Sequence, residues 1–122
     1  MTLSDVHGVL ANAAIMFSLI LGVWGLWRFF RREGFDSGYW GALVIGEALI
    51  LIQGLLGAYL YFFAGKDLTR TIHILYGVVA AITIPSAFAF TRGRDTFREM
   101  LIYGVVLLFL AAILLRAKMT GG

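Results

Sequence analysis

Four long apolar segments, separated by short polar connections, constrain this chain more than any other feature. They run over residues 7–30, 39–63, 72–90 and 97–115. Each is close to the roughly 20 residues that an α-helix needs to cross the hydrocarbon layer of a bilayer. The segments lack the in-out alternation of membrane β-strands, so helices are expected rather than a barrel. The sequence therefore predicts an all-α, integral-membrane four-helix bundle, with residues 1–122 forming a single domain.

The composition agrees with a membrane protein. Hydrophobic residues make up 61% of the chain and charged residues 14%, whereas soluble domains average roughly 45–50% apolar and about 25% charged residues. The first apolar segment has no basic region before it and is as long as a full span, so no cleavable signal peptide is expected. We expect a protein of a prokaryotic plasma (inner) membrane that contacts lipid and has no nucleic-acid partner. The lack of cysteine excludes disulfides, thiolate metal sites and covalently attached c-type haem.

Basic residues are divided unequally between the two ends of the expected bundle. The larger group follows the first and third segments, and the smaller group lies at the opposite end. The positive-inside rule then predicts that the larger group is cytoplasmic and that both chain termini are on the outer side. The larger group comprises Arg28, Arg31, Arg32, Arg92, Arg94 and Arg98, and the smaller group Lys66, Arg70, Arg116 and Lys118.

The chain has two histidines, His7 and His73, and each opens an apolar segment. Each precedes an arginine cluster by about 20 residues, or ~30 Å of helix, so both are expected at the same outer depth. The order of histidine, span, arginine cluster and second span occurs twice, which indicates a duplicated helical hairpin. Two imidazoles at one depth on two helices of a bundle form the axial ligand pair of a six-coordinate haem. We therefore predict non-covalent haem b with His7 and His73 as the metal ligands.

Small residues near these histidines fit a flat cofactor. Gly77 lies one helical turn after His73, and Gly54 and Gly57 lie near the outer end of the second span. These glycines are expected to leave room for the macrocycle. The amide of Gln53 is expected to orient a histidine, as residues around metal ligands commonly do.

Lys66 and Arg70 lie in the outer connection, where they are expected to pair with the haem propionates. The alternative is structural: the histidines cap helices or face lipid head groups, and the small residues serve close helix packing. Cofactor binding is favoured because ionisable residues within membrane spans usually mark functional sites.

Two further residues interrupt the apolar spans. Glu47 lies inside the second span, where it is expected either to act in proton relay or quinone contact, or to hydrogen-bond to a neighbouring helix. The structural role is favoured because no basic partner lies within a span. Pro85 is expected to kink the third span. The polar side chains within reach of Glu47 on other spans are Asn12, Ser18, Thr83 and Ser86.

The stretch Gln53-Gly54-Leu55-Leu56-Gly57, followed by an outer connection and by His73 on a Gly/Ala-rich span, resembles one four-helix module of the haem A synthase family. In that family a Gln-x-x-Leu-Gly type sequence precedes a helix with a haem-ligating histidine at its outer end. The partner histidine opens an earlier helix. The resemblance covers residues 7–90 and implies haem ligation by His7 and His73. The enzymes of the family fuse two such modules, and the family's glutamate three residues before a catalytic-side histidine is here Ser4.

These observations predict a small cytochrome b-like membrane protein that transfers single electrons near the outer face and is not an enzyme. One alternative is an accessory transmembrane subunit of a respiratory or photosynthetic complex that binds a quinone or a chlorophyll-type pigment. Another is a haem-modifying or haem-handling protein of the haem A synthase type. Expected partners are other membrane subunits or a second copy of the chain, together with a redox partner on the outer side or a quinone.

Overall fold

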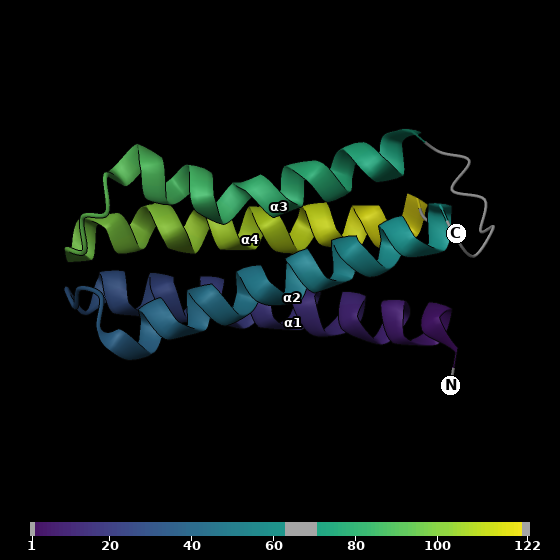
Figure 1. Cartoon of the computed structure of the whole chain (residues 1–122). Helices are drawn as coiled ribbons and strands as arrows, with labels where there is room; N and C mark the ends of the chain where they lie inside the picture. The colour runs from purple at the N-terminus through teal and green to yellow at the C-terminus, as the bar shows by residue number, and fades with distance from the viewer. Residues whose placement is uncertain (1, 63–70, 121–122) are drawn as a thin grey trace.

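The computed structural model describes residues 2–62 and 71–120. Four helices make up this part of the chain and lie side by side along a common axis (Figure 1). Each is long and apolar enough to cross a membrane, which confirms the predicted all-α bundle of four spans. The helices are α1 (Leu3–Phe30), α2 (Ser37–Phe62), α3 (Thr71–Thr91) and α4 (Phe97–Thr120).

The helices begin at side-chain caps that the sequence carries. Thr2 and Asp5 form a capping box on α1, in which each side chain accepts a hydrogen bond from the other residue's N–H. Asp36 caps α2 by accepting a hydrogen bond of 2.8 Å from the N–H of Tyr39. The capping box starts α1 before the predicted span at residue 7. His7 therefore lies inside a capped helix although it is close to the chain terminus.

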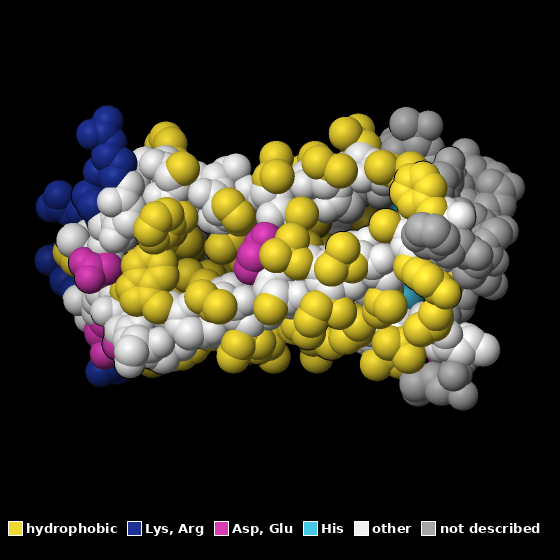
Figure 2. Space-filling model, viewed as in Figure 1, with side chains coloured by type: hydrophobic (Ala, Val, Ile, Leu, Met, Phe, Trp, Pro, Cys, Tyr) yellow, Lys and Arg dark blue, Asp and Glu magenta, His cyan; other side chains and the backbone are white. Residues whose placement is uncertain are grey.

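The helices follow one another around the bundle. α1 packs on α2 and α4, and α3 packs on the same two helices, so α1 and α3 stand on one diagonal. The two chain termini, the end of α2 and the start of α3 lie together at one end, here called the terminal end (Figure 1). The α1–α2 and α3–α4 turns lie at the opposite end. Basic side chains, all of them arginines, gather there in Figure 2, and we call it the arginine end.

The α1–α4 interface is the tightest in the bundle. A Cβ added to Gly25 would lie 3.2 Å from the Cα of Gly104, and one added to Gly22 would lie 2.8 Å from the Leu108 side chain. Glycine thus lets the two helices approach backbone to backbone, as small residues do in membrane bundles. Much of the buried core lies along α4, where Met100, Tyr103, Leu107 and Leu110 are fully enclosed.

Hydrogen bonds and an aromatic contact order the arginine end, and one of the hydrogen bonds joins the two turns. The N–H of Phe35 donates to the carbonyl of Asp95 over 2.9 Å, which links the α1–α2 turn to the α3–α4 turn. The Arg28 guanidinium donates to the Gly34 carbonyl and pairs with Asp36 at 3.5 Å. The phenol ring of the buried Tyr39 packs edge to face on Phe35, and its hydroxyl donates to the Leu21 carbonyl. The Phe35–Asp95 hydrogen bond holds the two hairpins together at this end, and the other contacts stiffen the first hairpin.

Candidate functional site

His7 lies near the start of α1 and packs against α2. A Cβ added to Gly57 would lie 3.1 Å from Cε1 of the His7 ring, so a larger residue would displace the imidazole. The ring also lies beside the backbone of Gln53, one turn earlier on α2. The glutamine and the second glycine of the Gln53–Gly57 stretch therefore both contact the first predicted ligand.

His73 lies near the start of α3 and is oriented by α4. Its Nδ1 is 2.8 Å from the carbonyl oxygen of Ala117. A carbonyl oxygen can only accept, so Nδ1 carries the hydrogen of this bond, and in the neutral imidazole the lone pair belongs to Nε2. A hydrogen bond from one ring nitrogen to a backbone carbonyl is the usual way in which a protein orients a metal-ligating histidine.

The two histidines come from helices on one diagonal and lie at the same end of the bundle. Each ring is held by a different neighbouring helix, His7 by α2 and His73 by α4. The rings are near enough to interact electrostatically. The two imidazoles thus lie at the same end of the bundle, the terminal end, as the helical spacing predicts.

Two polar atoms near this place lack partners among the described residues. Nδ1 of His7 and Oε1 of Gln53 are buried and form no hydrogen bond within residues 2–62 and 71–120. Gln53 meets His7 through its backbone, whereas the oxygen of its side chain orients neither histidine. Buried polar atoms without partners are uncommon in proteins and need an explanation.

The remaining predicted site residues show no contact with the histidines in the described part of the chain. Gly54 and Gly77 are exposed, and a Cβ added to either would meet no atom within 4 Å. Neither glycine packs against a histidine. Lys66 and Arg70, which were predicted to pair with propionates, lie outside the described residues.

The sequence reasoning missed two contacts at the terminal end. The Ala117 carbonyl orients His73, and the ammonium group of Lys118 donates to Oδ1 of Asn12, which ties the end of α4 to α1. Every residue has a backbone carbonyl, so the sequence gives no signal for the first contact. The second had a weak signal, since lysine is favoured in the last turn of a helix.

The donor set suits haem better than a bare metal ion. Within the described part of the chain, no group of three or more His, Asp or Glu side chains is arranged to hold a metal. A protein-bound metal ion usually takes three or four protein ligands. Haem iron already has four ring nitrogens, so two axial imidazoles complete it.

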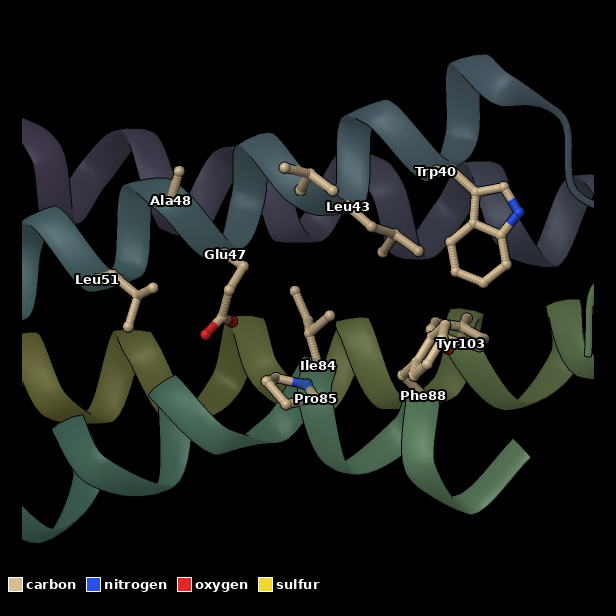
Figure 3. Close-up of a pocket in the computed structure, with 10 residues that line it drawn as sticks. Trp40, Leu43, Glu47, Ala48, Leu51, Ile84, Pro85, Phe88 and Tyr103 are labelled. Carbon is tan, nitrogen blue, oxygen red and sulfur yellow. The ribbon is translucent and has the colours of Figure 1, made fainter. Parts of the chain in front are cut away.

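Glu47 does not play the predicted structural role. It forms no hydrogen bond to any described residue, and its Oε1 is buried. Two of the expected partners are engaged elsewhere: Thr83 donates to the Val79 carbonyl over 2.6 Å, and Asn12 accepts from Lys118. The expectation of a hydrogen bond from Glu47 to a neighbouring helix is therefore wrong. Its side chain points from α2 into a groove beside Ile84 and Pro85 of α3 (Figure 3).

Comparison of the chain with protein-family models, with curated proteins and with solved structures yields no match.

Proposed function

We propose that this chain is a small membrane cytochrome of the b type, with haem held between His7 and His73 at the terminal end of the bundle. The observation that carries the proposal is the position of both imidazoles at one end of the bundle, with the His73 tautomer fixed by the Ala117 carbonyl. That tautomer leaves Nε2 as the ligating nitrogen. Nδ1 of His7 forms no hydrogen bond to any described residue, so no contact there competes with a metal for this nitrogen.

The proposed reaction is one-electron transfer. When bound, haem supplies the reversible one-electron chemistry, and ligation by two histidines leaves no open position on iron for a substrate. The residues of this chain have positioning roles. Gly57 lets His7 lie flat against α2, the Ala117 carbonyl holds the His73 ring, and the apolar helices exclude water.

We also propose that the terminal end faces the outer side of a prokaryotic plasma membrane. The arginine end carries the larger group of basic residues, which the positive-inside rule assigns to the cytoplasm. Because the chain has no cysteine, single-cysteine variants give a clean test. A membrane-impermeant maleimide should label Met119→Cys in intact cells, and should label Glu33→Cys only after lysis. The reverse pattern would invert the topology.

A duplicated hairpin would account for the paired site. His7 and His73 both lie near the start of their helices, α1 and α3, and both hairpins turn through an arginine in the left-handed region, Arg32 at φ 57° and Arg92 at φ 54°. A two-fold relation between the hairpins would bring the two histidines to opposite faces of one ring. This supports one shared haem rather than two separate ones.

The proposal is tested by an optical spectrum. Protein purified with haem should give the reduced-minus-oxidised spectrum of a low-spin b-type cytochrome, with one iron per chain. His7→Ala and His73→Ala should each lose the six-coordinate form, whereas Leu55→Ala on the exposed face of α2 should keep it. A sample without a b-type spectrum, or a low-spin spectrum that survives His7→Ala, would refute the pairing. Absorption by a magnesium pigment would favour the pigment-binding alternative instead.

A further inference from the structure

A groove of about 380 Å³ opens between α2 and α3, well away from the histidines. In Figure 2 it is a hollow on the visible face of the bundle, with an acidic side chain at its centre. Its volume falls in the range of small-molecule sites, roughly 300–1,000 Å³. Most of the side chains that line it are apolar or aromatic. These apolar and aromatic residues include Trp40, Val44 and Leu51 of α2 together with Pro85 and Phe88 of α3.

Among the described residues, Glu47 is the one acidic or basic side chain that lines this groove. About ten residues, or ~15 Å of helix, separate it from the start of α2 at Ser37, so it lies near the middle of the span. Its Oε1 is buried and has no hydrogen-bond partner among the described residues. A carboxyl group in hydrocarbon, with no cation beside it, is held in its neutral form, which both donates and accepts hydrogen bonds. An occupant of the groove would therefore stabilise the protein most if it brought a polar atom to this depth.

The end of the groove toward the arginine end is aromatic. The Trp40 ring packs edge to face on Phe88, with 5.8 Å between centroids, and on Tyr103, with 6.1 Å. The sides that face lipid are apolar and open, since Val44, Leu51 and Phe88 are each about half exposed or more. A flat ring with an apolar tail could thus enter from the bilayer and leave its tail in lipid.

The Glu47 carboxyl, whose buried Oε1 has no hydrogen-bond partner among the described residues, discriminates between the candidate occupants of the groove. A lipid acyl chain carries no polar atom near mid-membrane and would leave Glu47 without a partner. A transmembrane helix satisfies its own backbone groups, so it would need a polar side chain at one particular depth. A quinone ring brings a carbonyl oxygen that accepts a hydrogen bond from a neutral carboxyl.

We propose that the α2–α3 groove binds the ring of a lipid-soluble quinone, with the Glu47 carboxyl donating a hydrogen bond to one ring carbonyl. The rings of Trp40 and Phe88 form one end of the site, and the apolar tail of the quinone extends into lipid. This inference goes beyond the haem proposal and does not depend on it. Glu47 lies ten residues, or ~15 Å along α2, from Gly57, which contacts His7.

The test uses Trp40 as a reporter. Haem-free protein carrying Trp24→Phe and Trp27→Phe is placed in lipid nanodiscs and titrated with a decyl-substituted benzoquinone. Quenching of Trp40 fluorescence should saturate. A decyl-dimethoxybenzene, which has a similar shape but no carbonyl, should compete poorly for the site.

Variants of the groove complete the test. Glu47→Leu should weaken quinone binding about tenfold, the usual effect of losing one hydrogen bond, and Glu47→Gln should weaken it less because the amide still donates. Leu51 points toward the groove in Figure 3, so Leu51→Phe should narrow the groove and weaken quinone binding, whereas Ala112→Phe on the exposed face of α4 should not. If Leu51→Phe fails to fold, the carbonyl-free competitor still decides the question.

Three outcomes would overturn the inference: quenching that does not saturate, equal competition by the carbonyl-free compound, and unchanged affinity in Glu47→Leu. Co-purification of a stoichiometric second chain that protects Trp40 from quenching would also overturn it, in favour of a helix as the occupant. His73→Ala should leave the quinone affinity unchanged. The haem and quinone proposals can therefore fail separately.

Discussion

The α1–α4 and α2–α3 interfaces occupy equivalent places in a bundle of two hairpins, yet they are built in opposite ways. Gly22, Gly25 and Gly104 bring α1 and α4 into backbone contact. Between α2 and α3 the chain instead places Glu47 and Pro85, and a groove remains. Helix association in lipid depends on van der Waals packing, so the first interface supplies cohesion. The α2–α3 interface packs less closely, so a ligand from the bilayer can enter it.

The largest effect should come from overfilling the tight interface. Gly25→Leu would force its side chain into the Gly104 backbone and the Tyr39 hydroxyl, which cannot move aside. We expect a loss of about 3 kcal/mol or more in the free energy of unfolding. Unfolding in nanodiscs or mixed micelles measures it. Gly41→Leu on α2 is the matched control, because a Cβ there meets nothing within 4 Å. Equal stability of the two variants would show that the two interfaces do not differ as described.

A smaller effect is expected where Gly57 meets His7. Gly57→Ala places a Cβ 3.1 Å from the imidazole and should turn the ring away from α2. We expect haem affinity to fall about 10-fold to 100-fold, the cost of disturbing a group that positions a metal ligand. Haem titration followed by absorbance measures this, with Gly41→Ala as control. A comparable loss in Gly54→Ala would contradict the open position of that glycine.

Tyr39→Phe should cost about 1 kcal/mol of stability, because it removes a buried hydrogen bond to the Leu21 carbonyl that joins α2 to α1. Tyr103→Phe is the comparison. Its hydroxyl lies 3.5 Å from that of Thr91, a much weaker contact, so the loss should be smaller. Denaturation curves of the two variants check the order, and the reverse order would refute the assignment.

The smallest expected change in the free energy of unfolding is an increase, not a loss. Glu47→Leu removes a buried polar group without a partner and should raise the free energy of unfolding by up to about 1 kcal/mol in the absence of quinone. The same substitution should remove the extra stability that added quinone gives the wild type. Destabilisation by Glu47→Leu would indicate a hydrogen bond that the structure does not contain.

The fold could be predicted from the sequence because length and hydrophobicity suffice to define membrane helices. The placement of His7 and His73 at one end followed from helical rise alone. Glycine environments did not follow, because Gly25 and Gly41 are the same residue type in a helix, one packed against backbone and one open. Whether a helical glycine faces a neighbour depends on the rotation of each helix about its axis, which nearly uniform apolar spans leave undetermined.

The Glu47 interpretation failed for the same reason. Polar side chains at a suitable depth were present on other spans, yet depth does not tell which way they point. Thr83, for example, bonds within its own helix. The orientation of His73 by the Ala117 carbonyl could not be predicted either, because every residue has a backbone carbonyl.

The bond between the two turns at the arginine end has a consequence for how this sequence can vary. The link joins the Phe35 N–H to the Asp95 carbonyl, so it uses main-chain atoms alone. Most substitutions at positions 35 and 95 would leave it intact, and only proline at 35 would delete the donor. The neighbouring position that allows few residue types is Gly34, where a Cβ would lie 2.6 Å from the Asp95 carbonyl oxygen. Related chains that keep this contact should therefore retain glycine at position 34 and an aromatic ring at position 35, which packs on Tyr39, while the exposed side chain at position 95 can vary.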